Sequence, residues 1–254
     1  MKQRSWTIAI FTIVVLMIAS YAHEIVSRVP GYNSLHNHRP FYAAESIDKL
    51  LGALLCLIAV WLMHGRSPRA IGRELGFSAP ALPALAFALI ASSPMLLGFA
   101  ITRTLTPHLQ LLPLIFLTVF SPLVEELEFR GFGVRHLQRG TGWPFWLVVW
   151  PSSVLFGYGH VEQGQQLSEM AGLFLLTGSG GVIFAWLLYK WENLWVPVFL
   201  HICMNLWWEL FSVAKTAVGG WFPFALQSLT MLLSILITFY RKPSRPPAVS
   251  SVTG

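Results

Sequence analysis

The chain has 254 residues, of which 55% are hydrophobic and only 11% are charged. Soluble domains carry about 25% charged residues, so this composition excludes an ordinary soluble globular protein. The net charge of +6 comes from basic residues that lie mostly in connections between apolar stretches, as in the positive-inside pattern of membrane proteins. We therefore interpret the charge as a signal of membrane topology and do not predict nucleic-acid binding.

Apolar stretches recur along the whole chain, each close to the roughly 20 residues that a helix needs to cross a bilayer. We predict an all-α fold, a polytopic membrane helix bundle with about eight transmembrane helices. The predicted spans, in chain order, are 6–22, 46–63, 80–102, 110–129, 143–160, 168–190, 193–213 and 219–240.

Basic residues gather in alternate connections, which predicts the side that faces the cytoplasm. One side receives Lys2, Arg4, Arg66, Arg69, Arg73, Arg135, Arg139, Lys190, Arg241, Lys242 and Arg245, whereas the other receives Arg28, Arg39, Arg103, Lys215 and Lys49. We expect an integral multi-pass protein of a bacterial plasma membrane, with both termini cytoplasmic. An alternative is that the first span, which ends in Ser20-Tyr-Ala22, is a cleaved signal peptide.

Three further features of the sequence give little information about function. Cys56 and Cys203 lie within predicted spans and indicate apolar packing, not a disulfide framework. His36 and His38 lack a neighbouring carboxylate or thiolate, so we interpret them as part of a solvated loop in preference to a metal site. The Pro- and Ser-rich residues 243–254 predict a disordered cytoplasmic tail.

The fourth predicted span ends in a dense group of charges: Glu125, Glu126, Glu128 and Arg130. Charged side chains at hydrocarbon depth are costly and usually mark a working site. On an α-helix, residues four apart share a face, so Glu126 can pair with Arg130 while Glu125 is left free. A free carboxylate in an apolar cavity suits general acid or base chemistry, although a structural ion pair at the membrane edge explains the same residues.

Two further polar groups fall at a similar depth. His160 ends the fifth predicted span, and His201 and Asn205 lie four apart on one face of the seventh. At 1.5 Å per residue, Glu125 and His160 lie roughly 22 to 27 Å from the predicted cytoplasmic turns, and His201 and Asn205 roughly 12 to 20 Å. The sequence thus permits one shared site inside the bilayer.

These residues resemble the motifs of a known family. Glu-Glu-x-x-x-Arg at 125–130, Phe-x-x-x-His at 156–160 and His-x-x-x-Asn at 201–205 are similar, in this order, to the three motifs of the CPBP family. Its members include the Rce1-type CAAX prenyl endopeptidases and the bacterial Abi proteins. The resemblance covers about 111–213, which we treat as the catalytic core, with helices one to three in 1–110 and the last helix and tail in 214–254.

The resemblance implies an intramembrane endopeptidase acting on a membrane-associated, lipidated or prenylated CAAX-type protein, with membrane lipid as its other partner. Glu125 and His160 would activate a water molecule, and His201 and Asn205 would donate hydrogen bonds to the oxyanion. Glu126 and Arg130 would support the first motif, and Phe156 would pack beside His160. Glu128 stands where the family pattern is usually apolar, and we expect it to face water near the interface in preference to repelling Glu125.

The sequence leaves alternatives open for the cofactor and for the class of function. A zinc ion held by two histidines and a glutamate is conceivable, but Asn205 is a poor zinc ligand and His-Glu-x-x-His is absent, so we predict no metal and no cofactor. A catalytically silent immunity or scaffold protein of the same fold is the main alternative function. A transporter is a further one, against which the lack of an internal repeat counts.

Overall fold

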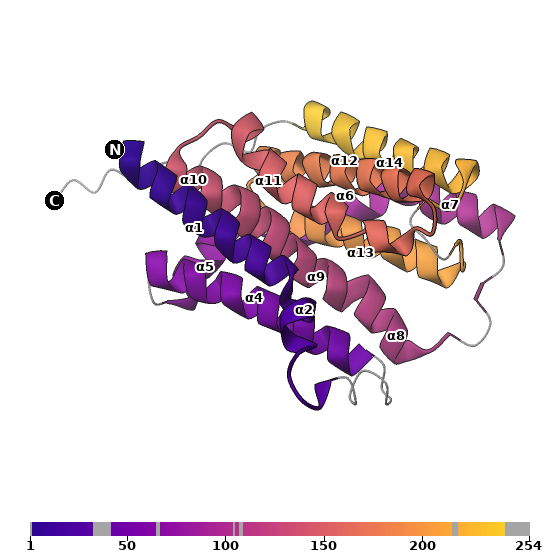
Figure 1. The fold of residues 1–254 in the computed structure, drawn as a ribbon. Coiled ribbons are helices and arrows are strands. Elements are labelled where there is room, and N and C mark those ends of the chain that lie inside the picture. The colour runs from indigo at the N-terminus through magenta and orange to yellow at the C-terminus, as the bar shows by residue number, and fades with distance from the viewer. Residues whose placement is uncertain are drawn as a thin grey trace.

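The computed structural model describes residues 2–32, 42–64, 67–103, 105–106, 109–214 and 218–241, which form helices and connections without a strand (Figure 1). This confirms the predicted all-α bundle. His36, His38 and the predicted tail lie outside the described residues. The elements are α1 (Lys2–Ser20), α2 (Ala22–Val26), α4 (Tyr42–His64), α5 (Pro68–Leu75), α6 (Ala81–Ala91), α7 (Ser93–Thr102), α8 (Leu111–Ile115), η1 (Phe116–Phe120), α9 (Ser121–Glu125), η2 (Glu126–His136), α10 (Leu137–Thr141), α11 (Phe145–Tyr158), η3 (Val161–Gln163), α12 (Leu167–Trp191), α13 (Trp195–Leu210) and α14 (Trp221–Tyr240).

Each predicted span is helical, with 80–102 divided between α6 and α7, but fewer than eight helices in the described residues are long and apolar enough to cross a membrane. Within the described residues these are α1, α4, α12 and α14, with a fifth span if α6 and α7, bent by 44°, are taken together. Helix α11 has 14 residues and α13 has 16, short of the roughly 20 that a bilayer needs. The protein is an integral membrane helix bundle, and the count of eight spans is not confirmed.

The basic connections meet at one end of the bundle, as four contacts between distant segments show. They are the ring contact of Trp6 with Trp143 at 4.7 Å, the Arg139 Nε to Glu74 Oε2 ion pair at 3.1 Å, the hydrogen bond from Leu194 N to Gly76 O at 3.0 Å, and Arg241 over the Trp191 ring at 3.9 Å. Which side of the membrane this end faces stays a prediction.

Helix α5 shows how sequence fixes this end. Ser67 caps its first turn by accepting from Ala70 N, and Pro68 occupies the first helical position, where its missing N–H costs nothing. Gly76 ends the helix at φ 98°, a left-handed conformation that glycine adopts without strain. The short helix therefore delivers the buried Leu75 and Glu74 to the helix that carries the charged motif.

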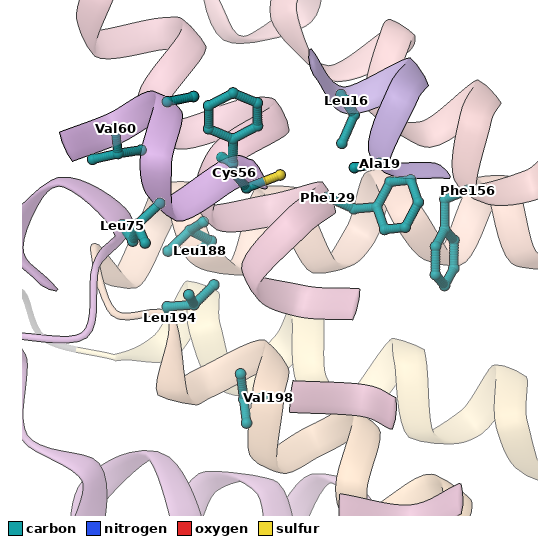
Figure 2. Close-up of a cluster of buried hydrophobic side chains, with 12 residues drawn as sticks. Leu16, Ala19, Cys56, Val60, Leu75, Phe129, Phe156, Leu188, Leu194 and Val198 are labelled. Carbon is teal, nitrogen blue, oxygen red and sulfur yellow. The ribbon is translucent and has the colours of Figure 1, made fainter. Parts of the chain in front are cut away.

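A cluster of buried hydrophobic side chains holds η2, the segment that carries most of the charged motif, in place (Figure 2). Phe129 and Phe132 of η2 are buried against side chains from α1, α4, α5, α12 and α13. Phe129 also packs edge-on against Phe156 of α11, with ring centroids 5.1 Å apart. Since burying one such side chain stabilises the fold by about 1.5 to 3 kcal/mol, the charged stretch is anchored by its apolar face.

The helix from Leu111 to Thr141 is continuous but not α-helical throughout. Two segments, η1 and η2, have the wider π-helical hydrogen bonding, in which each N–H reaches a carbonyl five residues earlier. The backbone over Glu126–His136 is therefore not α-helical as assumed for the charged motif, although the predicted pair of Glu126 and Arg130 does form. Such π segments are rare and occur frequently at functional sites.

Candidate active site

The motif residues come from three helices and line one cavity. Glu125 ends α9, His160 follows α11, and His201 and Asn205 lie on α13. The cavity has a volume of about 740 Å³, within the usual range for ligand sites. Its wall on α14 is largely apolar, with Phe224, Met231, Leu232 and Ile235. The structure thus brings together all four residues that the sequence placed at one depth.

Glu125 is not free, contrary to the prediction from helix spacing. Its Oε1 accepts hydrogen bonds from Lys49 Nζ and from Ser121 Oγ, both at 2.7 Å. Its Oε2 lies 3.9 Å from His201 Nε2. Oε1 is therefore held by two hydrogen-bond donors, and Oε2 faces a histidine of the cavity.

His201 is oriented by Glu126. Its Nδ1 lies 2.8 Å from Glu126 Oε1, and because an ionised carboxylate only accepts hydrogen bonds, Nδ1 carries the proton in this assignment. In the neutral ring Nε2 then bears the lone pair directed toward Glu125. Glu126 is completely buried and pairs through Oε2 with Arg130 Nε at 3.3 Å.

Arg130 and His160 both lie against the ring of Phe156. The Arg130 guanidinium is 4.0 Å from the ring centroid of Phe156, and the His160 ring centroid is 4.6 Å from it. His160 Nδ1 donates to the Phe156 carbonyl at 2.8 Å, because that carbonyl can only accept. The four-residue spacing of Phe-x-x-x-His thus fixes the tautomer of His160 and leaves Nε2 as an acceptor.

Asn205 is held by a backbone carbonyl of the helix that faces it. In η1 the N–H of Ser121 reaches the carbonyl of Phe116, five residues back. The next bond of this register would join residue 122 to Leu117, but Pro122 has no N–H. Asn205 Nδ2 donates to the Leu117 carbonyl at 3.0 Å instead. The second N–H of that amide remains for a ligand in the cavity, which Asn205 lines.

Glycine at position 157 allows the close packing of α11 on α12. A Cβ there would lie 3.0 Å from the Phe174 carbonyl oxygen and 3.2 Å from Gly178 Cα. At Gly159 the nearest atoms to such a Cβ are 3.6 Å away, an ordinary contact. Of the two glycines that precede His160, the first is required for the approach of a neighbouring helix.

Glu128 does not face water as expected. It is 6% exposed, and its Oε1 packs so closely against Gly52 of α4 that a Cβ on residue 52 would overlap it. It does not line the cavity that holds Glu125. The expectation failed because both the wider π-helical turns and the packing of α4 on η2 are tertiary features that residue spacing does not report.

The described residues contain no group of three or more His, Cys, Asp or Glu side chains arranged to hold a metal ion. In this arrangement His201 Nδ1 and His160 Nδ1 are already engaged by Glu126 and by the Phe156 carbonyl. The Nε2 atoms are therefore the ring nitrogens of these histidines that remain for hydrogen bonding and proton transfer in the cavity.

Comparison with known proteins matches the part of the chain that carries this geometry. Residues 106–207 match the family model described as type II CAAX prenyl endopeptidase Rce1-like. This segment, called the Rce1-like segment below, is similar to that family. The Bacillus subtilis protein named "Putative membrane peptidase YdiL" is 30% identical over 106 residues, which cover 41% of this chain and 39% of that protein. No solved structure matches the chain. At the family level the match supports a membrane protease.

Sequence reasoning missed two residues of the site. Ser121 lies one turn before Glu125 within the Rce1-like segment, and the four-residue spacing could have indicated its contact. Lys49 lies outside that segment, on α4, and had been counted with the basic residues of a connection. No local pattern connects positions that are 76 residues apart, so only the packing of α4 against α9 reveals this ion pair.

Proposed function

We propose that the protein is an intramembrane endopeptidase in which Glu125 activates a water molecule to hydrolyse a peptide bond. The observation that carries the proposal is the placement of Glu125 Oε2 beside His201 Nε2, at 3.9 Å, in a cavity also lined by His160 and Asn205. A carboxylate and imidazole nitrogens around one void are suited to general base and acid catalysis. The match of this segment to a protease family supports the same reading.

In the proposed reaction Glu125 and His160 position a water molecule, and Glu125 accepts its proton as the water oxygen attacks the scissile carbonyl carbon. The proton then passes to the amide nitrogen as the C–N bond breaks, which yields a carboxylic acid and an amine. Asn205 donates its second amide N–H to the developing oxyanion. His201 donates from Nε2 only when its ring carries both protons, and Glu126 holds the ring in place at Nδ1.

The proposed substrate is a membrane-associated protein, with a prenylated CAAX-type terminus as the specific candidate. The apolar cavity wall on α14 suits such a substrate, because apolar walls with few polar groups favour lipid-like ligands. We propose that helices α8 to α13 form the catalytic core. We further propose a bacterial plasma membrane, with the basic end of the bundle cytoplasmic, since Lys and Arg are enriched on that side.

The test is cleavage of a panel of prenylated and unprenylated peptides by the purified protein in liposomes, followed by mass spectrometry. Wild type is compared with Glu125→Ala and with Glu162→Ala, a matched change at an exposed carboxylate. We expect cleavage by wild type and by Glu162→Ala, none by Glu125→Ala, and no loss on adding a strong chelator. Loss with the chelator would favour a metalloprotease, and cleavage retained in Glu125→Ala would overturn the role of Glu125.

A further inference from the structure

Lys49 reaches the candidate site from a helix that the Rce1-like segment does not contain. It lies near the start of α4, and its Nζ donates to Glu125 Oε1 at 2.7 Å. The two side chains are 28% and 15% exposed. Its neighbour Asp48 accepts instead from Tyr32 Oη at 2.5 Å and lies 2.8 Å from His23 Nδ1. The anion that Lys49 contacts is thus the carboxylate proposed to activate water.

The geometry separates the two oxygens of that carboxylate. Lys49 and Ser121 both donate to Oε1, so rotation of the carboxylate would break two hydrogen bonds. Oε2 consequently stays directed toward His201 Nε2. Ser121 belongs to the same helix as Glu125 and contributes orientation only, whereas Lys49 contributes both orientation and a positive charge.

The other charged or titratable groups that face Glu125 do not supply an equivalent contact. Arg130, on the same helix, pairs with Glu126. His160 faces Glu125 from the turn after α11, His201 faces it from the middle of α13, and Glu128 on η2 is another carboxyl group near it. Lys49 is therefore the cation in direct hydrogen-bonding contact with Glu125 in the described part of the chain.

We propose that Lys49 is a positioning residue that holds Glu125 ionised, with Oε2 directed into the cavity. The proposal rests on the proposed function, because it assigns Lys49 a part in the same water-activating step. It also makes the site composite: the family-matched segment supplies the water-activating carboxylate, and an N-terminal helix outside it supplies the group that holds the carboxylate in its working state.

The kinetic test compares Lys49→Met with Lys49→Arg and with Lys190→Met, a matched change at the end of α12. The full-length protein in liposomes is assayed for kcat and KM across pH. We expect Lys49→Met to lower kcat by about 10²-fold, the effect of a misplaced catalytic group, with KM unchanged. Because the positive charge favours the ionised carboxylate, its removal should move the acid limb of the pH profile to higher pH. Lys49→Arg should restore most activity, and Lys190→Met should resemble wild type.

A second measurement does not depend on cleavage. Dicyclohexylcarbodiimide adds to protonated carboxyl groups in apolar sites, and mass spectrometry locates the adduct. We expect labelling of Glu125 at pH 7 to be low in wild type and Lys190→Met, and several-fold higher in Lys49→Met. Lys49→Gln provides a second uncharged variant if Lys49→Met does not fold.

The two measurements separate the two proposals. If wild type cleaves no peptide while both uncharged variants raise the labelling of Glu125, the proposed function fails and the action of Lys49 on Glu125 stands. If the uncharged Lys49 variants match Lys190→Met in labelling and in pH profile, the proposal for Lys49 is overturned, even where their thermal stability is lower.

Discussion

Two clusters of the same three chemical types lie along the helix from Leu111 to Thr141. One joins Glu125, His201 and Lys49, and the other joins Glu74, His136 and Arg139 at the basic end of the bundle. The first lines a cavity of about 740 Å³. In the second, His136 is completely buried and the ring of Phe132 stacks on it at 5.1 Å. The carboxylate of the first cluster thus lies beside space for water and a peptide, whereas the histidine of the second is closed off by packing.

The sharpest test of this contrast replaces one carboxylate in each cluster by an uncharged amide. We expect Glu125→Gln to lower kcat by about 10²- to 10⁴-fold, the usual contribution of a general base, with little change in thermal stability. Glu74→Gln should leave kcat per folded molecule unchanged. Peptide cleavage in liposomes measures kcat for both variants. An equal loss of kcat in both would contradict the assignment of catalysis to the first cluster alone.

Asn205→Ala probes the group that we propose for the oxyanion. We expect kcat to fall by about 10²- to 10³-fold, as for the loss of one oxyanion donor, while KM changes little. Single-turnover kinetics at saturating peptide separates the two quantities. A raised KM with normal kcat would assign Asn205 to substrate binding.

The cluster of Glu74, His136 and Arg139 should contribute to the free energy of unfolding. Glu74 Oε1 lies 3.4 Å from His136 Nδ1, and Oε2 lies 3.1 Å from Arg139 Nε. Removing the carboxylate charge in Glu74→Gln should cost about 1 to 3 kcal/mol of unfolding free energy. We expect the lower end, since the Arg139 side chain is 53% exposed to solvent screening. Thermal unfolding in detergent measures this cost, and an unchanged midpoint would contradict it.

The smallest expected effect concerns Pro122. Alanine there would supply an N–H to the Leu117 carbonyl and release the Asn205 amide from it. Losing about 1 kcal/mol of anchoring should lower kcat by about fivefold. Pro113→Ala, in the first turn of α8, is the matched control and should behave as wild type. Equal kcat values in the two variants would show that the anchor is not needed.

The sequence predicted the helices well because burial in lipid leaves a strong local signal. Every apolar window coincides with a helix, yet hydropathy could not tell a full span from the shorter α11 and α13. The four cavity residues were predictable because each stands in a short motif on a helix or directly after one. Their catalytic roles stay a prediction.

What the sequence did not reveal depends on packing between distant segments. Lys49 looked like a loop cation because its partner is 76 residues away. Glu128 was placed in water because the π-helical register of η2 has no signature in apolar periodicity. The role of Pro122 likewise became apparent only when the register of η1 and the position of Asn205 were known together.

The buried charges on the helix from Leu111 to Thr141 also bear on how the protein is made. On insertion scales a Lys, Arg or Asp at the centre of a helix costs about 2.5 to 3.5 kcal/mol, and this helix carries three glutamates and Arg130 within six residues. Their partners are Lys49, synthesised earlier, and His201, synthesised later. We therefore expect this helix to wait beside the translocon until α13 emerges, so that the ribosome completes most of the chain before the bundle enters lipid.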